Sequence, residues 1–240
     1  MKRSIVFGAM ALLAGPLLAA DSGPKDEVTA AAKKLADKDN YTWKITMDLG
    51  PNSQFTPGPS TGKTEKDGYT WLSVSFNDNT SIGVSKEKKV AVKTDEGWQS
   101  GQEASGDGGG GGGFNAATFM ARRMQNLKVP AAEVQDLVTK VQELKKDGDV
   151  YSGDLTEEGA KALLTMGFRR PGGQGPSNAK GSAKFWVKDG GLTKYETKVT
   201  GKRQNQNGDD VEIERTTTIE IKDVGTTKMD VPDEAKKKLS

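Results

Sequence analysis

The sequence predicts an α+β fold in which one strongly curved antiparallel β-sheet, a half-barrel, carries helices packed on its concave face. The first observation is the stretch between Asp210 and Asp223, where β-branched apolar residues alternate with charged residues without Gly or Pro. That period of two is typical of a strand with one buried and one wet face. At about 3.4 Å per residue this strand spans roughly 45 Å, which requires a large, twisted sheet. The second observation is the order of patterns: strands come early and late, and helices lie between them.

Residues 1–20 have the pattern of a cleaved signal peptide, with two basic residues, an apolar run over 5–18 and a Leu-Ala-Ala cleavage site. We predict export with cleavage after Ala20, and therefore a periplasmic or secreted protein. An uncleaved membrane anchor is the alternative. Because the sequence contains no Cys, it has no lipobox cysteine to carry a lipid. Residues 21–240 are predicted to form a single domain.

The composition argues against several kinds of chemistry. The chain has no His and no Cys, so it lacks the usual general base, the commonest metal ligand and any thiol. Its 35 basic and 33 acidic residues become 33 of each when Lys2 and Arg3 leave with the signal peptide, so charge gives no reason to expect nucleic acid. Residues 57–64 imitate a phosphate-binding loop, but Pro57 stands where that loop needs Gly. We therefore predict no enzyme, no catalytic residues, no metal and no cofactor.

The N-terminal part of the domain is predicted as a helix followed by a β-meander. A weak apolar stripe indicates a helix over 24–38, and residues 41–49 alternate as a strand. After a loop, residues 63–76 are predicted as one strand whose parity changes near Trp71. We expect a β-bulge there, or a strand that crosses between surfaces. The meander is completed by strands at 80–85 and 88–94.

The middle of the domain is predicted to contain helices and two flexible loops. Residues 101–113 include six consecutive glycines, so we expect a disordered loop there, and the Gly- and Pro-rich stretch 169–180 is expected to be flexible too. Helices are predicted at 114–127, 130–146 and 156–165, with a short strand at 150–155. The C-terminal third is predicted as a second meander with strands at 181–188, 192–200, 210–223 and 226–231, and with a final helix from Pro232.

In this order of elements the chain resembles the LolA/LppX-like fold of periplasmic carriers of lipoproteins or lipids. The amino-acid sequence is similar to the family in the hairpin FWVKDGGLTKYE and in the stretch TTTIEIKDVGTTKMDVP. The order of elements is similar over 41–232. The resemblance implies a half-barrel that holds a hydrophobic ligand on its inner face. Two features depart from the family: the lipobox Cys of the LppX-like lipoproteins is missing, and the glycine-rich insertion is not a family feature. No binding residue is carried over, because no position-specific motif matches.

Four tryptophans lie on predicted strands, where they either fill a core or line an apolar pocket of the kind that binds acyl chains. From the residues alone, a place in the core is the ordinary role of any one of them. Together with the resemblance, the pattern gives seven candidate ligand-binding residues: Trp43, Ile45 and Trp71 on strands, Val134, Leu137 and Val141 on a helix, and Arg215.

Arg215 interrupts the apolar face of the long strand, because its parity matches that of Ile213 and Ile219. One interpretation places it at a bulge or at the rim of the sheet, where the guanidinium reaches water. The other places it at the mouth of an apolar cavity, where it holds a phosphate or carboxylate head group. The sequence leaves both open.

The predicted function is that of an exported carrier or binding protein for a hydrophobic ligand such as a lipid or acyl chain. The alternative is a non-catalytic structural or sensory module that binds a protein partner and whose sheet is filled by its own helices. We expect a monomer in either case. Mass spectrometry of an organic extract of the purified protein distinguishes the two.

Overall fold

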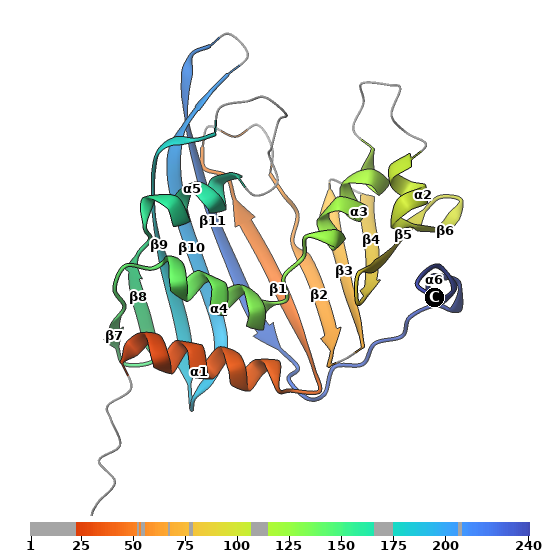
Figure 1. The fold of residues 1–240 in the computed structure, drawn as a ribbon, viewed down its shortest axis with the longest axis horizontal. Coiled ribbons are helices and arrows are strands. Elements are labelled where there is room, and N and C mark those ends of the chain that lie inside the picture. Colours follow the sequence, from red (N-terminus) through yellow and green to blue (C-terminus); the bar gives the residue numbers. More distant parts are fainter. Residues whose placement is uncertain are drawn as a thin grey trace, which may run out of the picture.

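The computed structural model of the protein describes residues 23–51, 53, 56–66, 68–76, 79–106, 115–165, 175–205 and 208–240 (Figure 1). The strands in these residues are β1 Asn40–Asp48, β2 Ser60–Glu65, β3 Tyr69–Phe76, β4 Asn79–Lys86, β5 Lys89–Thr94, β6 Gly97–Ser100, β7 Lys145–Asp147, β8 Val150–Asp154, β9 Ser177–Lys188, β10 Gly191–Gln204 and β11 Asp210–Lys222. The helices are α1 Pro24–Ala36, α2 Gly101–Gly106, α3 Ala116–Gln125, α4 Pro130–Lys140, α5 Glu157–Thr165 and α6 Asp233–Lys238.

These strands form one open antiparallel sheet in the order β6-β5-β4-β3-β2-β1-β11-β10-β9-β8-β7. The sheet consists of two meanders, β1 to β6 and β7 to β10, and β11 joins them by pairing with β1 on one side and β10 on the other. Ile219 of β11 lies opposite Ile45 of β1 and opposite Tyr195 of β10. The predicted antiparallel α+β sheet and its long strand at 210–222 are therefore confirmed.

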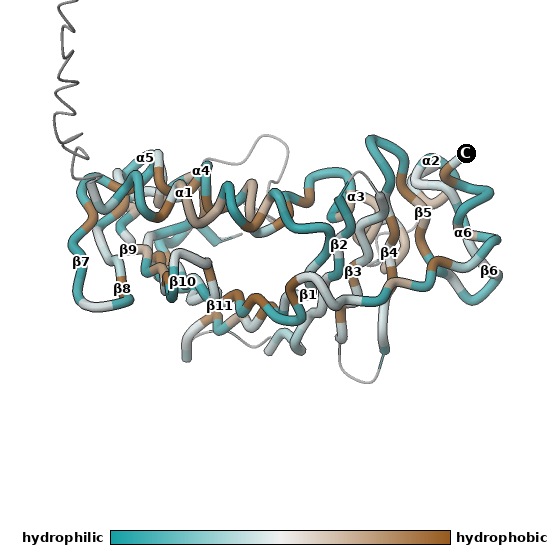
Figure 2. Tube along the Cα trace, turned by 90° about the horizontal axis from the view of Figure 1, so that it is seen from below, coloured by the Kyte–Doolittle hydropathy of each residue, from teal (hydrophilic) through white to brown (hydrophobic). Residues whose placement is uncertain are grey.

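Five of the helices lie on one face of the sheet. Helices α1 and α5 pack on β9 and β10, and α4 packs on α1 and α5. Helix α3 packs on β4 and β5, and α2 packs on α3 and β5. Seen along the sheet, α1, α4 and α5 lie on one side of β9, β10, β11 and β1 (Figure 2). We call this side the helix face and the opposite side the back face.

The register of the sheet decides which side chains reach each face. Trp43, Gly62 and Leu72 are neighbours across β1, β2 and β3, and they point to the helix face. Trp71 lies next to Leu72 and therefore points to the back face, beside Val84 of β4. Successive side chains thus divide between two cores.

The helix face carries two apolar clusters and the back face carries one. The larger helix-face cluster joins α1, α4 and α5 to β1 and β8 to β11, and the smaller joins α2 and α3 to β3 and β5. The back-face cluster lies beneath α6 and is built from Val84, Ala91, Val231, Ala235 and Leu239. The C-terminal segment therefore covers the back of one half of the sheet.

Two predicted elements differ in their boundaries. The single strand predicted at 63–76 is two strands, β2 and β3, separated by a turn at Lys66 and Gly68. Strand β3 itself is continuous and has no bulge. Both parities near Trp71 are apolar because β3 has a cluster on each face, with Leu72 and Val74 on one side and Tyr69 and Trp71 on the other. The helix predicted at 130–146 ends at Lys140, because Val141 is extended and forms a β-bridge with Leu155.

Three further predictions were wrong in part. Gly101–Gly106 is not part of a disordered loop but forms α2, which starts with a capping box: Ser100 N donates to Glu103 Oε2 at 2.6 Å, and Glu103 N donates to Ser100 Oγ at 3.3 Å. Residues 177–180 of the second predicted loop belong to β9, where Ala179 is buried. No strand forms at 226–231, which instead leads to α6. Residues 107–113 and 169–174 lie outside the described residues.

Candidate functional site

The interior between α4 and the sheet brings four of the candidate residues together. Trp43, Val134, Leu137 and Val141 belong to one cluster, and each is at most 2% exposed. The Trp43 indole lies across Gly62 of the neighbouring strand, where a side chain would meet its ring atoms at 2.1 Å. Glycine at this position therefore makes room for the largest fully buried side chain of the interior.

Burial on the helix face decreases along β1 and β11. Trp43 and Ile219, near one end of these strands, are buried. Met47 and Ile213, nearer the other end, are only half-buried, and beyond Ile213 the Val211 side chain is 41% exposed. We call the half-buried helix-face residues Met47 and Ile213 the open strip.

Ile45 lies between the closed interior and the open strip. It is half-buried and packs against both apolar clusters of the helix face, and Leu127, which follows α3, does the same. The two clusters therefore meet at Ile45 and Leu127, beneath the connection between α3 and α4.

A buried polar pair lies inside this apolar interior. The Tyr195 hydroxyl donates to Glu133 Oε2 at 2.6 Å, which links β10 to α4. Burial raises the pKa of Glu133, and the hydrogen bond from Tyr195 opposes that shift. Burial and the adjacent Glu133 carboxylate raise the pKa of Tyr195 well above its usual value, so the tyrosine is the donor at neutral pH.

Arg215 lies on the helix face, as its parity predicted. Its guanidinium donates to the main-chain carbonyl of Leu163 in α5, so it joins β11 to the helix layer. Burial lowers the pKa of Arg215, Glu133 opposes this shift, and Arg123 adds to it. The arginine therefore remains charged while largely removed from water.

Trp71 is not part of this site. It points to the back face, where its ring lies 6.0 Å from that of Trp98, centroid to centroid, in the cluster under α6. Trp186 also lies on the back face, with Lys194 Nζ 4.3 Å from its ring centroid. Only Trp43 of the four tryptophans reaches the helix face, so the candidate residues Trp43 and Trp71 lie on opposite faces of the sheet.

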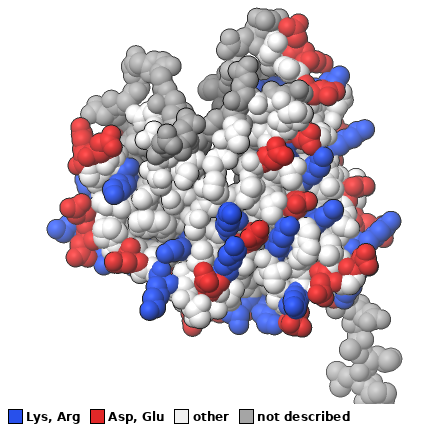
Figure 3. Space-filling model, turned by 180° about the vertical axis from the view of Figure 1, so that it is seen from behind, with Lys and Arg blue, Asp and Glu red and all other residues white. Residues whose placement is uncertain are grey.

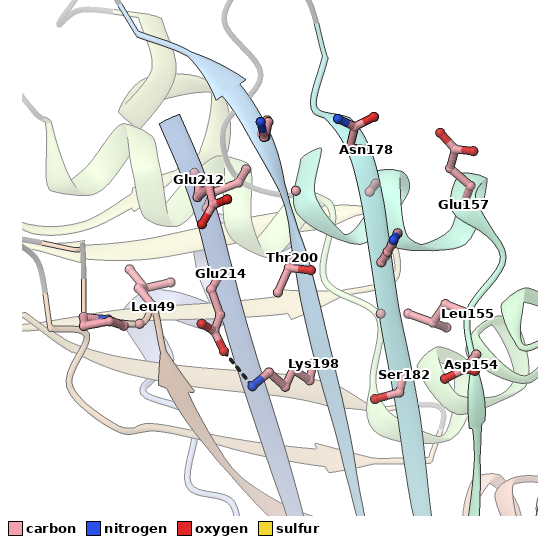
Figure 4. Close-up of a pocket in the computed structure, with 18 of the residues that line it drawn as sticks. Leu49, Asp154, Leu155, Glu157, Asn178, Ser182, Lys198, Thr200, Glu212 and Glu214 are labelled. Carbon is pink, nitrogen blue, oxygen red and sulfur yellow. Dashed lines mark ion pairs between the residues drawn. The ribbon is translucent and has the colours of Figure 1, made fainter. Parts of the chain in front are cut away.

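The back face carries a wide groove over β9, β10 and β11, with a volume of about 1200 Å³. Its walls include Lys198 and Glu214, whose side chains form an ion pair at 2.8 Å (Figure 4). Basic and acidic side chains are interspersed over this face of the molecule (Figure 3). Such a wet, mixed-charge groove is unsuited to an apolar ligand, which leaves the helix face as the candidate site.

Sequence reasoning missed the ionic residues of the interior, Glu133 and Arg123. Glu133 precedes Leu137 by four positions, a helical spacing that places both on one side of α4, and this signal was available. Arg123 follows Phe119 by four positions in α3, but only the contact between helices shows that it approaches Glu133.

The described part of the chain contains no group of three or more acidic, His or Cys side chains placed to hold a metal ion. None of the described helices is long and apolar enough to cross a membrane.

No protein-family model matches the chain, and no curated protein matches it. Among solved structures the chain is similar to lipoprotein LppX of Mycobacterium tuberculosis, with 10% identity, a TM-score of 0.49, and coverage of 89% of this chain and 100% of LppX. It is also similar to LprF from Mycobacterium bovis, with 11% identity, a TM-score of 0.48, and coverage of 88% and 97%. A DUF1329 family protein from Desulfovibrio piger has 11% identity, a TM-score of 0.30, and coverage of 85% and 93%. The similarity to LppX and LprF concerns the arrangement of helices and strands.

Proposed function

We propose that this protein is an exported carrier that binds a hydrophobic ligand, such as a lipid acyl chain, between its helix layer and the concave face of its sheet. The observation that carries the proposal is the gradient of burial along β1 and β11. The helix face of β1 is apolar, and that of β11 is apolar on both sides of Arg215 and Thr217. Trp43 and Ile219 are buried there, whereas the open strip is left half-covered. Apolar surface left open beside a closed apolar interior is where an apolar ligand gains most from leaving water.

The helix layer is suited to yielding to such a ligand. Val134 and Leu137 of α4 contact the sheet through apolar side chains, and apolar contacts have no fixed direction. An acyl chain can replace these apolar contacts, while the hydrogen bond from Tyr195 to Glu133 keeps α4 tied to β10. The ligand therefore enters at the open strip and extends toward Trp43 by displacing apolar side chains.

The size of the ligand follows from the energy of burial. A micromolar dissociation constant corresponds to about 8 kcal/mol, and one buried methylene contributes about 0.8 kcal/mol. The ligand must therefore bury on the order of ten methylenes. Ile213 and Ile219 are roughly 20 Å apart along β11 at about 3.4 Å per residue, which is long enough for such a chain.

The test compares two substitutions on adjacent residues of β1. Met47 belongs to the open strip, whereas Thr46 is exposed on the back face. Binding of a fluorescent long-chain probe should be lost in Met47→Glu, because an acid in the strip would have to be buried by the ligand. It should be retained in Thr46→Glu, which adds the same charge one residue away.

Native mass spectrometry and an organic extract of the purified parent protein complete the test. We expect a co-purified lipid, and its amount should fall in Met47→Glu alone. Equal binding by both variants, or no binding by the parent protein, would refute the proposed site.

A further inference from the structure

The C-terminal segment, residues 223–240, follows β11 directly but docks on the other half of the sheet (Figure 1). β11 pairs with β1 and β10, whereas α6 packs on β5 and β6. Val231, Ala235 and Leu239 of this segment belong to the back-face cluster, and each is at most 6% exposed. The segment therefore completes an apolar surface that lies several strands away from the strand it follows.

The surface beneath the segment is rich in aromatic side chains. The rings of Trp71 and Trp98 lie 6.0 Å apart, and Tyr69 packs against the same cluster. Val84 is fully buried there. An apolar surface of this kind needs a cover. The structure shows that residues 231–239 fit it, and every second copy of the chain carries the same residues.

The turn between β11 and this segment is strained. Asp223 has φ 51°, in the left-handed region that is costly for a residue with a side chain. The next residue, Val224, is an apolar residue that is 40% exposed. Main-chain N–H groups of Thr226 and Thr227 donate to the Asp223 carbonyl at 3.1 and 3.0 Å and close the turn. Opening the turn breaks these bonds, but it relaxes Asp223 and allows Val224 to be covered.

Beyond the turn, the segment is held by contacts that another copy can supply equally well. Thr227 Oγ1 lies 2.9 Å from Thr42 Oγ1, and Thr227 N donates to Asn40 Oδ1 at 2.8 Å. Lys238 of α6 forms an ion pair with Glu103 of α2 at 2.9 Å. If the segment crosses to a second copy, each of these contacts forms between two chains instead of within one. The difference between the two arrangements is therefore confined to the turn.

We propose that two copies of this chain form a symmetric dimer by exchanging residues 225–240, so that each segment covers the back face of the partner. Asp223 and Val224 become extended and act as the hinge. The two hinges run antiparallel, side by side, and bury the Val224 side chains against each other, which is an interface that the monomer lacks. The dimer is favoured by high protein concentration, because it is bimolecular. It does not depend on the ligand proposed above.

The first experiment uses the double variant Thr42→Cys/Thr227→Cys. The sequence contains no Cys, so this pair is the only source of a disulfide, and the hydroxyl groups it replaces are 2.9 Å apart. The reduced variant is refolded at high concentration, its dimer and monomer are separated by size exclusion, and each is diluted and then oxidised. On a denaturing gel without reductant, the dimer should run at twice the mass of one chain and the monomer at the mass of one chain.

Two results overturn the proposal. A dimer that separates into single chains on this gel would have associated without exchange. Parent protein that gives no dimer after refolding at high concentration would keep its segment on its own chain. The parent also shows whether the two cysteines themselves cause association, and Thr42→Cys alone, oxidised in the same way, gives the background of chance cross-links.

The second experiment compares Asp223→Gly with Asp189→Gly. Glycine adopts the left-handed conformation without steric cost, so Asp223→Gly relaxes the closed turn and should raise the dissociation constant of the dimer by at least about tenfold. Asp189 has nearly the same φ of 52°, but it lies in the turn between the paired strands β9 and β10, where no terminal segment can leave. Asp189→Gly should therefore leave the dissociation constant unchanged. Equal shifts in the two variants, or none in Asp223→Gly, would overturn the assignment of the hinge.

Discussion

The close approach of the Trp43 indole to Gly62 makes a sharp prediction about the interior. In Gly62→Ala, the new Cβ would lie 2.1 Å from Trp43 Cε2 and Cζ2, so the ring must move by more than an ångström. Trp43 is 1% exposed and packed within the large cluster, so the ring has no empty space to enter. Overpacking of this kind costs about 1–3 kcal/mol, and the severity of the clash places it near about 3 kcal/mol.

This destabilisation is measurable in two ways. For a domain of this size, 1 kcal/mol lowers Tm by about 2–4 °C, so Gly62→Ala should lower Tm by about 6–12 °C. Urea unfolding followed by circular dichroism should give the same change at an unchanged m-value. The control is Thr61→Ala, in the same strand but on the exposed side, which should change stability by less than about 0.5 kcal/mol.

A double-mutant cycle tests the physical cause. When Trp43→Leu is already present, the added methyl has room, so Gly62→Ala should cost at least about 1 kcal/mol less than it does in the parent protein. A cost below about 1 kcal/mol in the parent, or strictly additive effects, would show that the indole does not lie across Gly62.

Three further predictions concern other parts of the fold. Leu239→Ala should destabilise the docked C-terminal segment by about 2 kcal/mol and shift tryptophan fluorescence to the red, because Leu239 is 6% exposed beneath α6; an unchanged spectrum would contradict this. The Lys238 ammonium lowers the pKa of Glu103 to about 2, so the stability it contributes is present above pH 4.5 and is lost as pH falls toward 2. The Tm difference between the parent and Glu103→Gln should therefore vanish over that range, and a constant difference would disprove the coupling. Arg215→Leu should weaken palmitate binding while leaving Tm equal or higher, because an apolar residue can replace a buried charge that serves a ligand. A lower Tm with unchanged binding would instead mean that the contact with Leu163 serves the fold.

The parts of the fold that the sequence predicted are those where a single period is enforced by one buried face. β11 is such a case: its apolar residues keep one parity on both sides of Arg215 and Thr217, because β1 and β10 flank it and only one of its faces is covered. The end of α4 was missed because Val141 and Leu144 continue the helical spacing, yet both are buried after the chain has become extended. α2 was missed because residues 101–106 were grouped with the glycines that follow them, and the capping box of Ser100 and Glu103 was not considered.

The candidate site was predicted in its apolar half and missed in its polar half. Trp43, Val134 and Leu137 each follow a local pattern, and local patterns predicted that they share one interior. Trp71 was placed wrongly because both faces of β3 are apolar, so its period of two does not show which face meets the helix layer. Glu133 and Arg123 come together only through packing of α3 against its neighbours, which no local period encodes.

The position of β11 also determines when the protein can fold. Its partner β1 is made near the start of the chain, but Thr42 pairs with Lys222, so the centre of the sheet stays unfilled until almost the whole chain exists. Sheets with such distant pairings fold in about milliseconds to seconds. Synthesis, at about 5–20 residues each second, takes longer than that for a chain of this length, so the time at which the last strand is made sets the delay. An incomplete chain therefore consists of two meanders without a common centre. For the export proposed above, that delay would keep the polypeptide unfolded, and so able to pass through a narrow translocation pore, until its last strand has been made.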